Sequence, residues 1–500
     1  MPGLVVTTGV RVGATGTTAA PASSLFIVGT AQRGPTGEYK LVESFTQAEA
    51  IYGGYESTST LYDHLRTFFE EGGTRAYVVR VTGPSASSAA NLTFTDGSVT
   101  ALTFAQVGAG NWSDTLGVEI IDGILNDTRR VEVTYGGERV FLSADLDSNA
   151  AIKEALDASA GNYLTTTVNE AADLVQVTAA TTFSALGNHN NANVTDGALT
   201  GALSLFVPEL GAGVVSIPDT EAGLIDSPPD VWEALRNHAL ENNRLAYCAF
   251  AEGSDIDTPS TGAIALLEAG DNDGYSFYGT GSDSRKTDAS CMAFYWPWVE
   301  IPNGTGGSRL LSPETFAAAA RCRAHVETGP WRPSAGVISA SRFVSGLEFS
   351  VDSTASDNAN RARINPLRII EGGVRVYGAR SISADETNWR YITFRDTLNF
   401  IVVAAERRLE PFIFNMIDAR NAVFSDISAA LVNLLEPIRA AGGIYEGEND
   451  RGYTVEVSDA LNPQAQLAQG IIAAKVGVRI SSVGETINLL ITKSNLTTAV

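Results

Sequence analysis

The chain has 500 residues, 34 basic and 57 acidic, and its formal net charge is −23 at pH 7. Such a length exceeds one ordinary core and predicts two to four domains. An acidic surface repels duplex DNA, and the sequence has no run of Lys and Arg, so we expect no nucleic-acid partner. It also has no apolar stretch near the ~20 residues of a membrane helix and no secretory signal, so we expect no membrane insertion.

Both ends of the chain read as strands with one apolar face. A linker of small residues, 13–24, follows the first of them. A half-apolar strand at a chain end needs a partner. The residues that form these two apolar faces are Leu4, Val6, Val10 and Val12 at the N-terminal end, and Ile487, Leu489 and Ile491 at the C-terminal end.

A strand–helix–helix–strand run follows the linker, with strands predicted at 24–29 and 75–81. Ser44 and Gln47 form the pattern of a capping box at the start of the first helix, and Gly72 ends the second. Beyond this run, short strands with polar turns, such as Asp96-Gly97 and Gly136-Gly137, surround one helix. This change in pattern predicts an inserted β-rich domain.

Alternating strands and helices then return. One predicted helix carries a capping box from Asp230 to Glu233. Another has Ser312 at its N-cap, Pro313 and Glu314 in its first turn, and Gly329 just past its end. A buried strand is expected before this helix, at 291–301. The expected elements beyond the helix are, in chain order, a strand at 374–382, two long helices near 394–409 and 421–441, and strands at 453–457 and 475–481.

The expected fold class is therefore α/β (α+β) and multidomain. The predicted division is an N-terminal arm and linker (1–24), a first core part (25–81), an inserted β-rich protruding domain (82–205), a core α/β domain (206–365), a C-terminal α+β domain (366–482) and a C-terminal strand arm (483–500).

Residues with catalytic chemistry are scarce. No His-x-x-x-His, Cys-x-x-Cys or Gly-x-Ser-x-Gly pattern occurs, so we expect neither an enzyme nor a metal or other cofactor. The loop 279–287 ends in Lys-Thr but lacks the glycines of a phosphate loop, and we interpret it as a surface loop. Phe294–Trp298 reads as a buried strand, and 448–452 as a solvated turn. The remaining candidates read as helical or loop histidines and buried thiols of a cytosolic product: His64, His189, His238, His325, Cys248, Cys291 and Cys322.

Several stretches resemble contractile bacteriophage tail sheath proteins. They are, in chain order, "SLFIVGTAQRGP", "LVESFTQAEAIYGG", "LYDHLRTFFEEGGTRAYVVRV", "AFYWPWVEIPN", "SRLLSPETFAAAARCRAHVETGPWRPSAG" and "INPLRIIEGGVRVYGARSI…NWRYITFRDTLNFI". Tyr377 stands where the family usually has Trp, and Ser381 where it has Thr. The resemblance covers roughly 24–81 and 205–500, and residues 82–205 match only in kind.

The resemblance implies a subtilisin-like α/β core without protease function and a subunit that stacks in hexameric rings around a tail tube. The terminal arms would add strands to sheets of neighbouring copies, and contraction would drive the tube through a host envelope and allow genome ejection. It also implies a tail tube protein, baseplate and tail terminator proteins as partners, and a place in the tail of a virion assembled in the host cytoplasm.

Other interpretations stay open. Both arms could pair within their own chain, as ordinary edge strands do. The sheath could belong to a phage-like bacteriocin or an extracellular injection machine instead of a phage. An α/β hydrolase is a further alternative, although no nucleophile and base are evident in the sequence.

Overall fold

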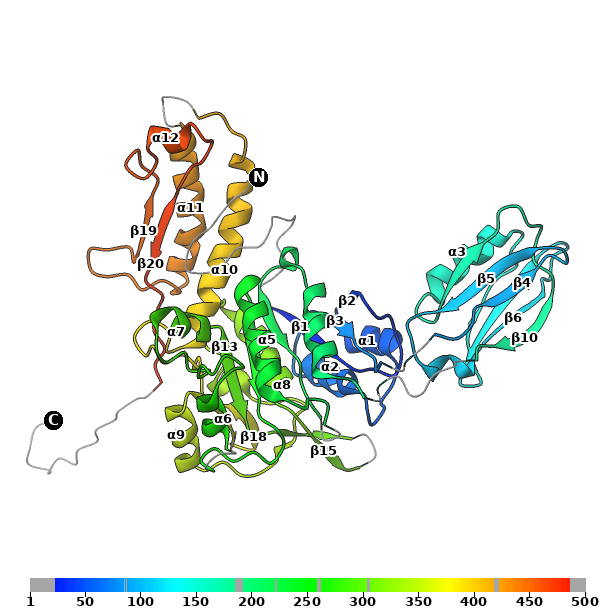
Figure 1. Ribbon diagram of the computed structural model, residues 1–500, viewed down its shortest axis with the longest axis horizontal. Coiled ribbons are helices and arrows are strands. Elements are labelled where there is room, and N and C mark those ends of the chain that lie inside the picture. Colours follow the sequence, from blue (N-terminus) through cyan, green and yellow to red (C-terminus); the bar gives the residue numbers. More distant parts are fainter. Residues whose placement is uncertain are drawn as a thin grey trace, which may run out of the picture. The chain divides into compact units, whose positions relative to one another are not determined.

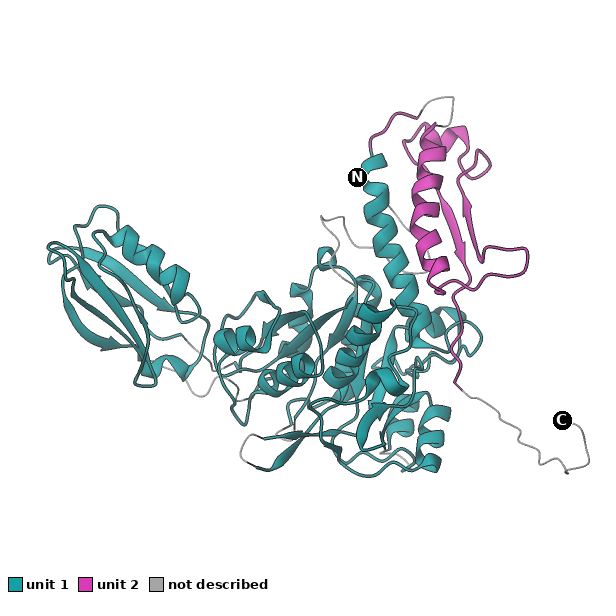
Figure 2. Ribbon diagram, turned by 180° about the vertical axis from the view of Figure 1, so that it is seen from behind, with its two compact units in different colours: residues 1–413 teal, residues 414–500 magenta. Residues whose placement is uncertain are grey.

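The computed structural model comprises two compact units, Met1–Ile413 and Phe414–Val500 (Figure 2). The structure describes residues 23–485 except 85, 87, 185–190, 192, 221–222, 259–261, 304–305 and 418–421. The described part holds twelve α-helices and several sheets, so the expected mixed α/β, multidomain class is confirmed (Figure 1).

An eight-stranded sheet forms the centre of the first unit, in the order β18-β17-β13-β12-β11-β1-β3-β2. The inner strands run parallel, while β2 and β18 pair antiparallel at the two edges. These strands are β1 (Ser24–Gly29), β2 (Tyr39–Val42), β3 (Ala76–Arg80), β11 (Gly213–Ser216), β12 (Leu245–Ala249), β13 (Met292–Trp296), β17 (Ile364–Ile370) and β18 (Gly373–Val376).

Both faces of this sheet are buried, which explains the continuous apolar runs of its strands. Phe26 and Val28 of β1 join one hydrophobic cluster, whereas Leu25 and Ile27 join the other. The first cluster includes residues of α5 (Pro228–Glu241), α6 (Ala263–Ala269), α7 (Asp283–Ala289) and α9 (Ser353–Arg361). The second includes residues of α1 (Phe45–Tyr52), α2 (Thr60–Glu70) and α8 (Glu314–Glu327).

A separate hydrophobic core, which we call the β-rich module, lies within residues 89–183. One sheet has the order β10-β6-β7-β8 and the other β4-β5-β9. The elements are β4 (Leu92–Thr95), β5 (Thr100–Gln106), β6 (Leu116–Asp122), β7 (Arg129–Tyr135), β8 (Glu138–Leu142), α3 (Asn149–Ser159), β9 (Leu164–Val168) and β10 (Thr178–Thr182). Gly97, Gly136 and Gly137 adopt positive φ at the predicted hairpin turns, which are confirmed.

The remaining elements of the first unit are short, apart from one long helix. They are α4 (Asp196–Gly201), β14 (Val299–Pro302), β15 (Ser308–Leu311), β16 (Gly346–Leu347) and α10 (Ile392–Leu409). The second unit contains α11 (Ala422–Ala440), β19 (Tyr453–Glu456), α12 (Gln464–Leu467) and β20 (Lys475–Val478). Both predicted long helices are therefore confirmed as α10 and α11.

A buried ion network holds the first turns of α10 against α8. The Arg321 guanidinium donates to both oxygens of Asp396 at 2.7 and 2.6 Å, and His325 lies 2.9 Å from Asp396. Although burial opposes ionisation, Arg321 and His325 together lower the pKa of Asp396 to about 2. The ion pair and its hydrogen bonds compensate Arg321 and Asp396 for the hydration that they lose on folding.

Several local predictions were wrong. Helix α5 begins at Pro228 after Ser227, so Asp230 and Glu233 lie inside the helix and form no capping box. The N-cap of α8 is Pro313, because the Ser312 hydroxyl instead donates to the Asp219 carbonyl at 3.0 Å and accepts from the Asp219 N–H.

Other corrections concern element boundaries. Residues 279–287 are not all loop, because α7 starts at Asp283 with Ser282 as its cap. The strand predicted at 291–301 is broken at Pro297 into β13 and β14, and the strand predicted at 374–382 ends at Val376. The Ser44 cap is confirmed, since its hydroxyl accepts from the Gln47 N–H, but the Gln47 side chain bonds Glu43 instead of Ser44.

Candidate assembly interface

The terminal arms predicted to join neighbouring copies lie outside the described residues. This applies to Leu4, Val6, Val10, Val12, Ile487, Leu489 and Ile491. The structure therefore places none of them, and their pairing stays a prediction. What it does describe is a surface with the properties of a strand acceptor.

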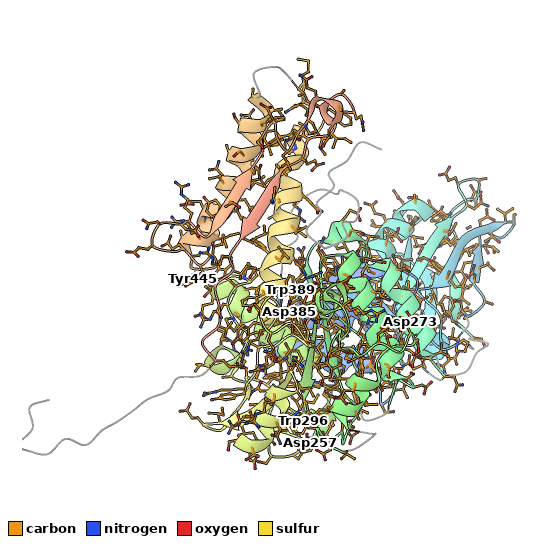
Figure 3. The ribbon with its side chains drawn as sticks, turned by 60° about the vertical axis from the view of Figure 1, so that its left-hand side comes forward. Asp257, Asp273, Trp296, Asp385, Trp389 and Tyr445 are labelled. Atoms are coloured by element: carbon orange, nitrogen blue, oxygen red, sulfur yellow. The ribbon has the colours of Figure 1, made fainter. Side chains whose placement is uncertain are left out.

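Strands β19 and β20 form a sheet of two strands in the described part of the second unit. Tyr453 pairs with Val478 and Glu456 with Lys475, antiparallel. Tyr445, labelled in Figure 3, extends the pairing, because its N–H donates to the Arg479 carbonyl at 2.8 Å. Each of β19 and β20 has a neighbour on one side only, so each leaves one edge of backbone groups available.

The register shows which residues face these edges. The Arg479 N–H donates to the Gly452 carbonyl at 2.7 Å, which makes these two residues a hydrogen-bonded pair. In an antiparallel ladder such pairs alternate with pairs whose backbone groups point outward. Val455 therefore presents its N–H and C=O to the open edge of β19, and Val476 presents its own to the open edge of β20.

The two faces of this sheet differ in polarity. Tyr453 and Val455, with their cross-strand partners Val478 and Val476, share the face toward α11. All four are buried or half-buried. Thr454, Glu456 and Lys475 are exposed on the opposite face. An added strand with one apolar face would extend both the apolar face toward α11 and the polar face opposite it.

A polar cluster ties β19 to α11 beneath the sheet. The Tyr453 hydroxyl donates to one oxygen of Glu436 at 2.7 Å, and Arg439 donates to the other at 2.6 Å. Arg439 also contacts Glu446. The hydrogen bonds from Arg439 and Tyr453 lower the pKa of Glu436 to about 2. The cluster holds the orientation of the strand on the helix.

A groove of about 700 Å³ lies between α11 and the segment that follows β19. Half of the wall residues that α11 provides have small side chains. The wall consists of Phe424, Ser425, Ser428, Ala429, Val432 and Asn433 from α11, and Val457, Ser458 and Asp459 from the segment after β19.

His64 and Thr315 form the kind of pair, a histidine beside a hydroxyl, that a hydrolase would use as base and nucleophile. Their side chains lie 3.0 Å apart, and the other ring nitrogen of His64 lies 2.8 Å from the Asp219 carbonyl. Both residues are fully buried, and burial lowers the pKa of His64 to about 4. Because solvent and substrate cannot reach the pair, it works as a core hydrogen bond.

Cys248, Cys291 and Cys322 are free and buried, as expected. No cluster of three or more His, Cys, Asp or Glu in the described part of the chain is suited to a metal ion. His189 lies outside the described residues. Among the described helices, none has the length and apolar character needed to span a bilayer.

Solved structures of other proteins share this fold. No family model and no curated protein matches the chain by sequence. A sheath tail protein from Listeria innocua superposes with a TM-score of 0.58 at 12% identity over 89% of this chain and 90% of that chain. The chain has the fold of contractile sheath proteins.

This sheath fold extends along nearly the whole chain. The contracted helical sheath of the anti-feeding prophage gives a TM-score of 0.53 at 16% identity over 99% of both chains. The contracted sheath complex of an extracellular contractile injection system gives 0.54 at 15% identity over 98% of both. At these identities the likeness concerns the fold, and it agrees with the family resemblance of the sequence.

The sequence predicts arms at both chain ends, but it gives no acceptor for them. Strands near 453–457 and 475–481 were predicted, yet their pairing and open edges were not. One signal was present in the sequence: Val455 alternates with Thr454 and Glu456, which is the pattern of a half-buried strand. The open edges follow only from the tertiary arrangement.

Proposed function

We propose that this chain is the structural subunit of a contractile sheath, which polymerises by exchanging terminal strands between copies. The observation that carries the proposal is the sheet of β19 and β20, with two open edges and one apolar face. The sheath fold supports it over the full length of the chain. The arms of 1–24 and 483–500 are the proposed occupants of the open edges.

The arms match the acceptor in pattern. Val10 and Val12 flank Arg11, and Ile487 and Leu489 flank Asn488, so one face of each arm is apolar; Val5 and Leu490 are the apolar exceptions on the opposite faces. A strand of this kind would direct its apolar side chains toward α11, and its polar ones outward. Main-chain hydrogen bonds then supply affinity and the alternating side chains supply register, as in other cases of strand addition.

The expected strength suffices for a permanent joint. About six backbone hydrogen bonds contribute roughly 0.5–1.5 kcal/mol each. Burial of several Val, Leu or Ile side chains adds about 1.5–3 kcal/mol per fully buried residue. Such a joint can persist while the globular bodies change position, with 13–24 and 481–485 as spacers.

In this function, copies of the chain stack as hexameric rings around a tail tube, between baseplate and tail terminator proteins. The extended sheath is a trapped state, and contraction drives the tube through a host envelope. The core (25–81 and 206–365) would have a subtilisin-like fold without protease activity. Residues 82–205 would form a protruding domain, and residues 366–482 would contain the sheet that accepts the arms. The sheath belongs to a virion tail or, as the alternative, to a bacteriocin or injection system.

Blocking an open edge tests the proposal directly. Proline at Val455 removes an N–H that faces away from β20, so the two-stranded ladder stays intact while an incoming strand loses a donor. Val455→Thr keeps the donor and is the matched control. In electron micrographs we expect long hollow tubes from the parent and from Val455→Thr, and short or absent tubes from Val455→Pro and from chains lacking 1–12 or 486–500.

A mixing experiment distinguishes exchange between copies from pairing within one chain. A chain lacking both 1–12 and 486–500 keeps its acceptor but has no arms, and the Val455→Pro chain keeps its arms. If strands exchange, the two defective chains form a mixed complex in analytical ultracentrifugation, which the armless chain alone does not form. Normal tubes from every truncated chain, or no complex on mixing, would refute strand exchange.

A further inference from the structure

Two arginines face each other at one edge of the eight-stranded sheet. Arg368 of β17 pairs directly with Arg375 of β18 in the antiparallel register. Like charges in this arrangement are destabilising unless an anion separates them. Arg375 contacts Glu371 at 2.7 Å, but the Glu371 side chain is 78% exposed. Arg368 makes no hydrogen bond or ion pair within the described residues.

The surroundings of this pair are basic and partly aromatic. The Arg368 guanidinium lies 5.0 Å from the centre of the Tyr377 ring, and Tyr377 is 45% exposed. The Nε atoms of Arg368 and Arg375 are buried without a hydrogen-bond partner. Residues 361–380 contain five arginines and a single acid, in a chain of net charge −23. We call Arg368, Arg375 and Tyr377 the arginine face.

The β-rich module has the opposite character. Residues 89–183 contain 13 acidic and four basic residues. Each basic residue already has an acidic partner in the module: Arg129 with Asp122, Arg130 with Asp145, Arg139 with Glu132 and Lys153 with Asp157. The acidic surplus is therefore not neutralised by basic side chains of the module itself.

The turn between β6 and β7 presents apolar side chains within this acidic surface. Ile124 is 84% exposed and Leu125 is 66% exposed. The turn is nevertheless held in place, because the Leu125 N–H donates to Asp145 at 2.8 Å and the Thr128 hydroxyl donates to the Leu125 carbonyl at 2.6 Å. Large aliphatic side chains on an ordered turn are typical of a contact surface.

We propose that the β6–β7 turn of one copy docks on the arginine face of another copy, a contact that rests on the proposed sheath function and adds to strand exchange. Ile124 and Leu125 would cover the Tyr377 ring. The carboxylates around the turn would supply the anion that Arg368 lacks and a second one for Arg375, whose partner Glu371 is exposed. Charged and apolar groups are thus complementary on both sides.

Charge reversal in the full-length chain tests the contact. We expect Arg368→Glu combined with Arg375→Glu to raise the critical concentration for tube formation at least tenfold. Lys40→Glu with Arg285→Glu changes the net charge equally at other sites and should stay within twofold of the parent. High salt should weaken parent tubes and leave the reversed variant nearly unchanged.

Disulfide trapping locates the contact. A chain with Ile124→Cys and Tyr377→Cys should give ladders of linked copies on a non-reducing gel once tubes form. Ile124→Cys with Val326→Cys is the control, because Val326 is also exposed but lies outside the arginine face, and it should give none.

The outcomes separate this inference from the proposed function. Tubes of the Ile124→Cys, Tyr377→Cys chain that give no ladders, or equal assembly of both charge variants, would reject the docking contact and leave strand exchange standing. A parent chain that never forms tubes would reject both. Binding of a duplex DNA probe to the unassembled parent, lost on reversal of Arg368 and Arg375, would assign the arginine face to a polyanion and overturn the proposal.

Discussion

The eight-stranded sheet and the sheet of β19 and β20 solve the problem of strand edges in opposite ways. The large sheet is buried on both faces by helices. At its β18 edge, Ser341 exchanges backbone and hydroxyl hydrogen bonds with Val374, and the Ser339 hydroxyl accepts from the Val376 N–H. The small sheet has one apolar face and two open edges in the described chain.

The difference shows which sheet satisfies its backbone hydrogen bonds within one chain and which sheet leaves edge groups unpaired within the described residues. A sheet closed on its faces and covered at an edge gains its stability within one chain. A two-stranded sheet is marginal in water on its own, and α11 supports this one on one face while both edges stay open in the described chain. We therefore expect the first unit to fold to full stability alone and the small sheet to be stabilised by assembly.

Hydrogen exchange should give the largest contrast between the two sheets. In the unassembled chain, amides of β13 should exchange only by global opening, several orders of magnitude more slowly than those of β19 and β20. In tubes, the amides of Val455 and Val476 should become protected, since their N–H groups face the open edges. Equal protection of both sheets in the unassembled chain would contradict the comparison.

Removal of Asp396 should destabilise the first unit strongly. Asp396→Ala leaves the buried Arg321 without its counter-ion, which costs about 3–5 kcal/mol. Glu327→Ala breaks an ion pair whose side chains are 52% and 35% exposed, and should cost less than about 1 kcal/mol. Urea unfolding of the two variants measures the difference, and similar costs would contradict the structural role of the network.

Truncation of one side chain in each sheet tests whether they are energetically separate. Phe294 is fully buried and packs edge-on against Trp232 with ring centres 4.9 Å apart. Phe294→Ala should therefore cost about 3–5 kcal/mol. All six tryptophans precede residue 390. The unfolding transition followed by tryptophan fluorescence should shift for Phe294→Ala and stay within about 0.5 kcal/mol of the parent for Val476→Ala.

The buried Glu314 should make stability depend on pH. Desolvation raises its pKa to about 8, from 4.5 in an unperturbed glutamate. Between these values the folded chain holds a proton that the unfolded chain has lost, so the free energy of unfolding falls as pH rises. Glu314→Gln removes this contribution. Its advantage over the parent should grow from pH 5 to pH 8 by on the order of a few kcal/mol, and an unchanged difference in urea unfolding would refute the shift.

Local patterns predicted much of the fold. The buried strand around Phe294, the hairpin turns at Gly97 and Gly136, and the helices α10 and α11 were all evident from apolar periodicity and turn residues. Errors arose where two local signals compete. Pro228 and Asp230 both suit a first helical turn, and Ser312 can cap a helix or bond another loop.

The open acceptor and the arginine face could not be predicted in the same way. Arg368 and Arg375 lie seven positions apart, and only the strand register makes them direct neighbours. Val455 and Val476 come from segments separated by α12, and the direction of their N–H groups depends on which residues pair. Such properties belong to pairs of segments, and periodicity within one segment carries no information about them.

The sequence alone determined the acidic character, the division into α/β and β-rich stretches, and the apolar alternation at both chain ends, because these depend on residue type and spacing. Tertiary structure alone decided which edges stay open, which histidine and threonine are sealed in the core, and which charges oppose each other. The physical reason is that burial, register and electrostatic pairing arise between residues far apart in the chain, where free energy is shared among several elements at once.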